Sequence, residues 1–265
     1  MISLMSPSPR PHRPTNSADD GDATVDFGFR RVPEAEKASL VRGVFESVAP
    51  RYDMMNDLMS LGVHRLWKAE LIDRLVPRPN MRLVDVGGGT GDIAMRFCER
   101  GGGPVTVIDI NTEMLTVGRD RAIDSGRLTG IDWLCGDAEA LPVRDSSFDA
   151  CTAAFSLRNV THPDRALAEA RRVLAPGGRF LCLEFSPAVS GWLAGLYDAY
   201  SFRILPALGR IVAGDADSYR YLAESIRRFP EPDRFTAMIA AAGFDRASHR
   251  RLSGGIAVLY SAWRL

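Results

Sequence analysis

Several features that carry strong functional signals are absent from this chain of 265 residues. Its 33 basic and 33 acidic residues cancel, so no overall positive field attracts nucleic acid. No apolar run approaches the roughly 20 residues that a membrane-spanning helix needs, and no internal repeat is visible, which argues against a repeat architecture. The remaining composition, 46% hydrophobic and 25% charged, is that of an ordinary globular protein large enough for one domain.

Cysteine is also scarce, and its spacing is uninformative for metal binding. The four cysteines are Cys98, Cys135, Cys151 and Cys182, and none of them belongs to a Cys-x-x-Cys pair. Three lie in segments that we predict to be strands, so we expect buried, reduced thiols and neither disulfides nor a metal site. Reduced thiols are typical of a reducing compartment, which predicts a cytoplasmic protein.

The N-terminal segment has few large apolar side chains. Residues 1–25 are rich in proline, serine and aspartate, which predicts a disordered tail. No continuous apolar segment follows the first methionine, so the segment does not resemble a signal peptide. Arg10 and Arg13 are weakly typical of a transit sequence, but the acidic residues of the same segment argue against one.

What the chain does have, from residue 82 onward, is an alternation of apolar segments that predict strands and amphipathic segments that predict helices. This alternation predicts an α/β fold with a mostly parallel sheet covered on both faces. We expect the last two strands, joined around Ser253-Gly254-Gly255, to form an antiparallel hairpin at the sheet edge. The seven strands are expected near 82–86, 104–109, 131–135, 148–154, 179–185, 244–251 and 255–263.

The same patterns divide the folded part of the chain, over 26–265, into four regions. Apolar residues at helical spacing precede the first strand, and another helical segment separates the fifth strand from the last two. We therefore expect, in order, a helical cap over 26–77, a ligand-binding core over 78–186, a helical lid over 187–243 and the C-terminal hairpin over 244–265.

Glycine is concentrated directly after the first strand, in the run Gly87-Gly88-Gly89-Thr90-Gly91-Asp92. Such a turn bends tightly and lets a ligand approach the main chain. The third glycine of a dinucleotide-binding Gly-x-Gly-x-x-Gly motif would fall at position 92, where Asp92 would repel a diphosphate. A carboxylate suits a cationic ligand instead, such as the sulfonium and amino groups of S-adenosylmethionine. We therefore predict that Gly87, Gly89 and Asp92 bind this methyl donor.

Acidic residues also end the next two strands. Asp109 follows Asp85 by one strand–helix–strand step, the usual position of the ribose-hydroxyl acceptor in nucleoside-binding α/β folds. Asp137 can accept a hydrogen bond from an adenine amino group, and Ala138 leaves room for the ring. A single aspartate is more often a helix cap or turn residue. Three of them at successive strand ends favour a site for the methyl donor.

Four further segments resemble the signatures of the UbiE/COQ5 family of quinone-biosynthesis C-methyltransferases. The resemblance covers about residue 26 to the C-terminus and leaves only the tail outside. It implies a Rossmann-like class I methyltransferase with a seven-stranded sheet, and methyl transfer to a ring carbon of a polyprenylated benzoquinol or of demethylmenaquinol. The segments are 52–67, 155–159, 172–186 and 215–226.

Carried over position by position, the family's contacts with S-adenosylmethionine fall on Thr90, Asp109, Asp137 and Ala138. The chain departs from the family at Ala154, where a serine hydroxyl is common, and at Ser156, where glycine is common. The resemblance therefore implies that one hydroxyl contact with the donor is lost at position 154.

The chemistry that the resemblance implies needs no metal, because the methyl group of a sulfonium is already activated. A quinol carbon becomes nucleophilic when the neighbouring hydroxyl, with a pKa near 10, loses its proton. We predict that Arg158 stabilises the phenolate and that Asn159 orients the acceptor. His64 is a candidate base or a structural histidine, and Tyr52 either closes the site or packs in the core.

The acceptor region leaves alternatives open. Apolar residues over 192–208 suit a wall for the isoprenoid tail, a surface in contact with the membrane interface, or a packed lid. The candidate partners are the lipid-tailed quinol, the inner face of the membrane and a quinone-biosynthesis complex; nucleic acid is not expected, and the sequence does not determine the oligomeric state. The alternative functions are O- or N-methylation of another apolar molecule and a non-catalytic role in such a complex.

Overall fold

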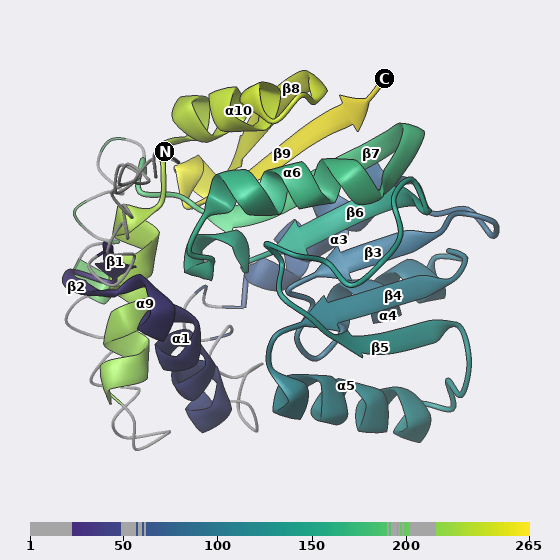
Figure 1. The fold of residues 1–265 in the computed structure, drawn as a ribbon, viewed down its shortest axis with the longest axis horizontal. Helices are drawn as coiled ribbons and strands as arrows, with labels where there is room; N and C mark the ends of the chain where they lie inside the picture. Colours follow the sequence, from purple (N-terminus) through teal and green to yellow (C-terminus); the bar gives the residue numbers. More distant parts are fainter. Residues whose placement is uncertain are drawn as a thin grey trace, which may run out of the picture.

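The computed structural model describes residues 23–48, 62–189 and 216–265, together with residues 57, 60, 191, 195, 197 and 199–201. Its centre is a seven-stranded sheet in the order β5-β4-β3-β6-β7-β9-β8 (Figure 1). Sheet neighbours from β5 to β7 pair in parallel, β7 pairs antiparallel with β9, and β9 pairs antiparallel with β8. The expected mostly parallel sheet with a C-terminal antiparallel hairpin is therefore confirmed. Its strands are β3 (Leu83–Val86), β4 (Val105–Asp109), β5 (Ile131–Cys135), β6 (Phe148–Ala154), β7 (Leu174–Phe185), β8 (Asp245–Leu252) and β9 (Ala257–Arg264).

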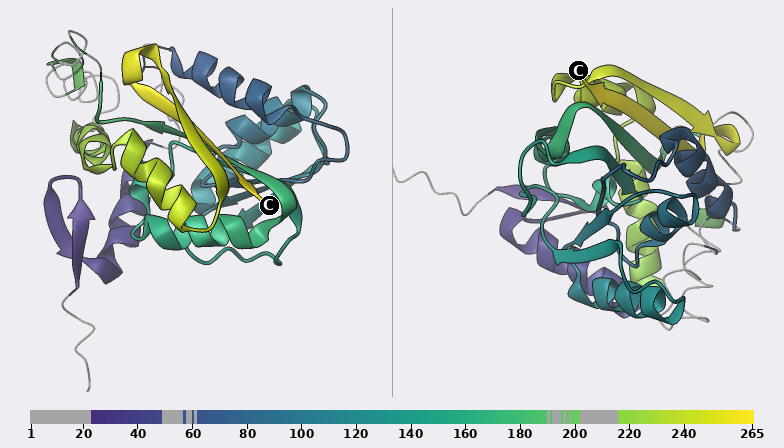
Figure 2. Two further views of the ribbon diagram at one scale, coloured as in Figure 1. Left: turned by 90° about the horizontal axis from the view of Figure 1, so that it is seen from above. Right: turned by 90° about the vertical axis from the view of Figure 1, so that its right-hand side faces the viewer.

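Helices cover both faces of the sheet, as the alternation of the sequence predicts. Helices α3, α4 and α5 pack on one face and α6 and α10 on the other; the left view of Figure 2 shows α3 and α6 on opposite sides. Successive strand residues point to opposite faces, so Leu83 joins one hydrophobic core and Val84 the other. The helices are α3 (His64–Leu75), α4 (Asp92–Glu99), α5 (Thr112–Asp124), α6 (Pro163–Val173) and α10 (Pro232–Ala241).

A third group of elements lies beyond the carboxyl ends of the parallel strands. Helix α1 (Glu34–Val48) and helix α9 (Ala216–Arg228) contact each other there and stand beside the sheet in Figure 1. The expected cap over 26–77 is helical only in part, because it begins with an antiparallel hairpin of β1 (Thr24–Phe27) and β2 (Arg30–Pro33). Strands of four residues are too short to show an alternating pattern.

The four cysteines differ in exposure, so the expectation of buried thiols is correct only in part. Cys151 and Cys182 are buried in the central strands β6 and β7, whereas Cys98 is half-buried and Cys135 is exposed. Cys135 ends β5, which is an edge strand, and the sequence does not distinguish an edge strand from a central one. Within the described residues, no helix is long and apolar enough to cross a membrane.

Candidate active site

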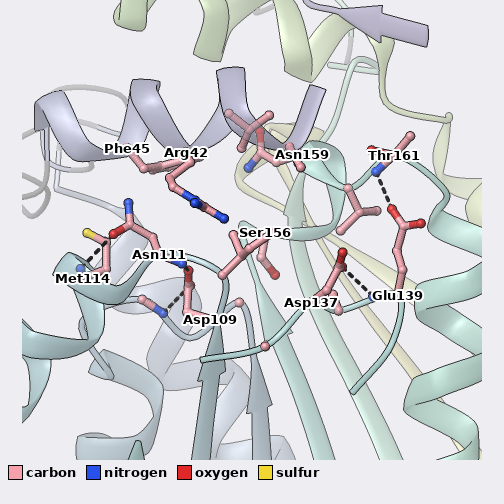
Figure 3. Close-up of a pocket in the computed structure, with 18 of the residues that line it drawn as sticks. Arg42, Phe45, Asp109, Asn111, Met114, Asp137, Glu139, Ser156, Asn159 and Thr161 are labelled. Carbon is pink, nitrogen blue, oxygen red and sulfur yellow. Dashed lines mark hydrogen bonds between the residues drawn. The ribbon is translucent and has the colours of Figure 1, made fainter. Parts of the chain in front are cut away.

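One cavity opens where the carboxyl ends of β3, β4 and β5 meet helix α1 (Figure 3). Its floor is formed by the glycine turn after β3 and by the chain that leaves β4, and one side by the loop after β5. The opposite side comes from the short helix η2 (Leu157–Asn159) and the residues around it. A crevice at the carboxyl ends of the strands is where open α/β sheets bind ligands.

The glycine turn contributes backbone to the cavity. Gly87 and Gly89 both line it, with φ angles of 62° and 55° that disfavour any other residue. A Cβ atom on Gly87 would lie 2.4 Å from Cβ of Ser156, whose hydroxyl donates to the carbonyl of Val86 at 3.0 Å. Glycine at position 87 therefore lets the turn and Ser156, just after β6, approach each other closely.

Asp109 lies at the end of β4 and is tied to the glycine turn. Its Oδ2 accepts a hydrogen bond from the backbone N–H of Gly89, and its Oδ1 accepts one from that of Asn111, both at 2.8 Å. Burial raises the pKa of this carboxyl group. Each carboxylate oxygen has two lone pairs, so the group keeps acceptor capacity for a ligand such as a ribose diol.

Asn111 was missed by the sequence analysis. It caps α5 with Oδ1, which accepts from the backbone N–H groups of Glu113 and Met114, and its residue is only 2% exposed. Its Nδ2 has no hydrogen-bond partner among the described residues, although Asn111 lines the cavity. A buried amide donor of this kind costs free energy unless a ligand or water satisfies it. An asparagine before a predicted helix is interpreted as a helix cap, and the sequence gives no sign that its Nδ2 group also lies at the cavity.

The side of the cavity after β5 carries Asp137 and Ala138, both predicted to surround an adenine ring. Asp137 is exposed, and its Oδ1 accepts from the backbone N–H of Glu139 at 2.9 Å. Glu139 accepts in turn from the N–H of Thr161 at 2.7 Å (Figure 3) and from that of His162 at 2.8 Å. The loop after β5 is therefore joined directly to the segment that follows η2.

Arg172 of α6 holds the same loop from the other side. Its guanidinium donates to the carbonyls of Leu141 and Val143 and pairs with Asp145 and Glu169. Glu169 also accepts from the N–H of Leu141 at 2.7 Å. The loop that carries Asp137 and Ala138 is thus anchored by a side chain that does not line the cavity.

Asp92 and Thr90 do not line the cavity, unlike the other predicted donor-binding residues. The Asp92 carboxylate lies 2.7 Å from Nζ of Lys68 and 2.8 Å from Nε of Arg96. Burial acts to raise its pKa, but these two cations outweigh burial and lower it. We expected this carboxylate to face a cationic ligand. In the structure it faces the cationic side chains of Lys68 and Arg96 instead. Thr90 is buried in the turn that leads into α4.

An acidic residue that we did not predict as part of the site lies beneath the glycine turn. Asp85 in β3 is fully buried, and its Oδ1 accepts from the hydroxyl of Thr152 at 2.7 Å. Its other oxygen has no partner among the described residues, and it would lie 2.7 Å from a Cβ atom on Gly88. Burial raises the pKa of Asp85 to about 7, so this carboxyl group titrates near neutral pH.

Arg158, predicted to stabilise a phenolate, is buried next to Glu184. Its Nη1 lies 2.9 Å from Oε2 of Glu184 and donates to the carbonyl of Phe155 at 2.6 Å; the side chains of Arg158 and Glu184 are 1% and 0% exposed. Arg158 lines a neighbouring cavity beneath the β1–β2 hairpin and not the one bounded by the glycine turn. Burial raises the pKa of Glu184, which the guanidinium opposes.

The remaining predicted residues lie in three different places. Asn159 lines the cavity, where Figure 3 shows it in the wall opposite Asp109. His64 is 4% exposed at the start of α3, its Nδ1 lies 2.9 Å from Oγ of Ser60, and it is absent from the cavity lining. Burial lowers the pKa of His64 to about 4, so it is neutral at pH 7. Tyr52 lies outside the described residues.

Arg42 was also missed by the sequence analysis. It comes from α1, and Figure 3 shows its guanidinium reaching over the cavity toward the side that carries Asp109. Among the described residues that line the cavity it supplies the positive charge, whereas Asp109, Asp137 and Glu139 supply negative charges. The helical spacing of α1 identifies an apolar face but not which flanking residue meets the cavity.

The comparisons with known proteins agree with this geometry. A model of the ubiE/COQ5 methyltransferase family matches residues 30–264. The chain belongs to the UbiE/COQ5 methyltransferase family. A protein of Acidiphilium cryptum, named ubiquinone/menaquinone biosynthesis C-methyltransferase UbiE, is 57% identical over 94% of this chain and 100% of its own length. A protein of the same name from Methylobacterium nodulans is 59% identical over 92% of this chain and 98% of its own.

Solved structures of low sequence identity share the fold. A SAM-dependent methyltransferase of Thermotoga maritima, a possible histamine N-methyltransferase, covers 85% of this chain and 100% of its own, with a TM-score of 0.62 and 20% identity. A phosphoethanolamine N-methyltransferase of Haemonchus contortus, solved with S-adenosyl-L-methionine, covers 75% of this chain and 52% of its own, with a TM-score of 0.57 and 14% identity. The class I methyltransferase fold is therefore confirmed.

S-adenosylmethionine, the donor used by this family, fits the side chains present. Gly87 and Gly89 line the cavity with backbone alone, and the Asp109 carboxylate keeps acceptor capacity beside its bonds to the N–H groups of Gly89 and Asn111. Asp137 is exposed next to the small Ala138, as an adenine amino group and ring would require. The unpartnered Nδ2 of Asn111 points to a ligand in the same cavity.

Proposed function

We propose that this protein catalyses the S-adenosylmethionine-dependent C-methylation of the quinol ring of a polyprenylated precursor in ubiquinone or menaquinone biosynthesis. The observation that carries the proposal is that five predicted donor-binding residues, Gly87, Gly89, Asp109, Asp137 and Ala138, line one cavity together with Asn159. The family membership and the names of the relatives support the same reaction. The reaction needs no metal, because the donor supplies a methyl group already activated on a positively charged sulfur.

The chain's own residues divide the work of binding the donor between the three strand ends. Asp109 accepts from the ribose hydroxyls, because both of its oxygens are held in place by backbone N–H groups. Asp137 accepts from the adenine amino group, next to the space that Ala138 leaves. Gly87 and Gly89 bring backbone against the methionine part of the donor. We also assign Arg42 to the negatively charged carboxylate of that part, since it is the cation over the cavity.

The acceptor half must hold a quinol ring with a reactive carbon next to an oxygen. Holding both reactants in one cavity converts an encounter in solution into a positioned reaction. Asn159 lies opposite Asp109 and is assigned to the ring oxygen, to which an amide N–H can donate. Because His64 does not line the cavity, its candidacy as the base has no geometric support in the structure.

We infer that the protein works in the cytoplasm at the inner face of the membrane, since a quinol with a long prenyl tail resides in lipid. The apolar segment over 192–208, proposed to contact the tail or the interface, lies largely outside the described residues. Membership of a quinone-biosynthesis complex is a further proposal with no support from the geometry.

The decisive experiment is quinone profiling by mass spectrometry in cells that lack this protein. Accumulation of the demethylated ubiquinone precursor, of demethylmenaquinone or of both identifies the acceptor, and re-expression of the wild-type protein must restore the methylated quinone. The matched control is re-expression of Asp109→Ala, which should fail to restore it. A normal quinone profile in the deleted strain would refute the proposal and favour methylation of another small apolar molecule.

A further inference from the structure

The hydroxyl of Tyr221 approaches the active-site cavity from outside it. Tyr221 lies in α9 and is 5% exposed, and its hydroxyl donates to Oδ1 of Asn159 at 3.1 Å. Asn159 lines the cavity, whereas Tyr221 lines the neighbouring cavity beneath the β1–β2 hairpin. Any effect of Tyr221 on a bound acceptor is therefore exerted through the Asn159 side chain.

The ring of Tyr221 is itself held in place by the N-terminal hairpin. It stacks on Phe27 of β1 with 4.2 Å between the ring centroids and 22° between the planes. Phe27 is 5% exposed and belongs to the hydrophobic core. Burial raises the pKa of Tyr221, so its hydroxyl stays protonated and remains a donor over the physiological range.

The direction of this hydrogen bond decides which end of the Asn159 amide faces the cavity. An asparagine side chain has an acceptor end and a donor end that are almost equal in shape. When a hydroxyl donates to Oδ1, the Nδ2 end is directed away from that hydroxyl, and its two N–H donors are left for a ligand. The backbone of Asn159 is also anchored, because its N–H donates to the carbonyl of Ser156 at 3.0 Å.

We propose that Tyr221 is a positioning residue that orients the Asn159 amide so that its N–H donors meet the oxygen of the acceptor ring. This inference rests on the proposed function. Donors directed at an oxygen stabilise the negative charge that develops there as the adjacent carbon becomes nucleophilic. Without the Tyr221 hydroxyl the amide can turn over, and its carbonyl oxygen would then repel the same atom.

The test uses the full-length protein with S-adenosylmethionine and a short-tailed methoxybenzoquinol. Tyr221→Phe keeps the ring stack on Phe27, removes one hydroxyl and should lower kcat about twofold to tenfold, the range expected for one hydrogen bond. Affinity for S-adenosylhomocysteine should stay within about twofold, because the donor groups are untouched. The matched control is Tyr260→Phe, which removes a buried hydroxyl that has no partner among the described residues and lies in the core.

A double-mutant cycle separates positioning from a general structural effect. In an Asn159→Ala background, Tyr221→Phe should cause no further loss of kcat, because the side chain through which it acts is gone. An unchanged kcat in Tyr221→Phe, or losses that multiply in the double variant, would overturn the inference. Thermal unfolding of each variant establishes that it is folded before its kinetics are compared.

A second readout does not depend on turnover and distinguishes failure of this inference from failure of the proposed function. The side-chain amide signals of Asn159, identified in a ¹⁵N–¹H NMR spectrum by their loss in Asn159→Ala, should shift in Tyr221→Phe and not in Tyr260→Phe. Unshifted signals would refute the inference even if the wild type methylates the quinol. Shifted signals with no turnover of the quinol by the wild type would refute the acceptor assignment and leave the orientation of Asn159 supported.

Discussion

Removing the charge of Glu184 should destabilise this protein strongly. Its carboxylate and the Arg158 guanidinium are 2.9 Å apart, and their side chains are 0% and 1% exposed. Glu184→Gln keeps the size of the side chain but leaves a buried guanidinium without a counter-charge, and breaking such a pair costs about 3–5 kcal/mol. For a domain of this size each 1 kcal/mol lowers Tm by about 2–4 °C, so we expect a decrease of roughly 6–20 °C.

The free energy of unfolding is measured by urea denaturation, with circular dichroism as the signal. The urea concentration at the midpoint of unfolding should fall while the m-value stays constant. The control is the double variant Arg158→Met with Glu184→Leu, which replaces both charges with apolar groups and should recover most of the lost stability. A loss below about 1 kcal/mol in Glu184→Gln would refute the argument from burial. The double variant also tests the phenolate assignment: full stability with lost turnover would assign the Arg158 guanidinium to chemistry, and retained turnover would assign it to the fold.

Three further predictions concern the donor side of the site. Asp109→Ala should weaken binding of S-adenosylhomocysteine about tenfold or more in calorimetry, because hydrogen bonds to a charged group contribute about 1.5–3 kcal/mol; equal affinity would contradict the ribose assignment. Arg172→Ala should also weaken binding of S-adenosylhomocysteine, because the loop that carries Asp137 loses its anchor. At a saturating concentration of the methyl donor, the quinol should still be methylated at a near-normal rate. Unchanged affinity would show that the loop keeps its position without Arg172. Asp85 has a folded-state pKa raised from 3.8 to about 7, so the folded protein binds more protons than the unfolded chain between these values. Its contribution to stability is full below pH 4 and is lost as the pH rises through 7. The stability of the wild type relative to Asp85→Asn should therefore fall over that range in denaturation curves, and a rising difference would refute the burial argument.

Much of the fold follows from local sequence patterns, because most strands of the main sheet are apolar segments bounded by glycine, proline or a charge; the edge strand β8 is the polar exception. The predicted bounds of β3, β4 and β5 agree with the structure to within one or two residues. The hairpin of β1 and β2 was not predicted. Each of its strands has four residues, and Phe27 is the one buried hydrophobic side chain in β1. Its position depends on contacts with Tyr221, almost 200 residues away, which no local pattern records.

Backbone positions in the site were easier to predict than side-chain directions. Gly87, Asp109 and Asp137 line one cavity because parallel strands bring their carboxyl ends to the same edge of the sheet. Arg158 lies only one residue from Asn159, yet it faces Glu184 of the neighbouring strand. Which way a long charged side chain turns depends on partners from distant elements, so motif position alone does not determine it.

At Asp92 the sequence argues against a dinucleotide ligand, but the contacts of this carboxylate in the structure differ from the predicted ones. It begins α4, and a diphosphate would need the free N–H groups at such a helix N-terminus. In the structure the carboxylate of Asp92 lies at that end, and the buried Lys68 of α3 approaches it to 2.7 Å. The position is therefore occupied by an ion pair of the protein, which leaves no open anion site there. A dinucleotide stays disfavoured because this carboxylate would repel a diphosphate, while in the structure the carboxylate contacts Lys68 and Arg96. We therefore expect Asp92→Asn to weaken the packing of α3 against α4, and so the stability of the fold, more than it changes which ligand binds.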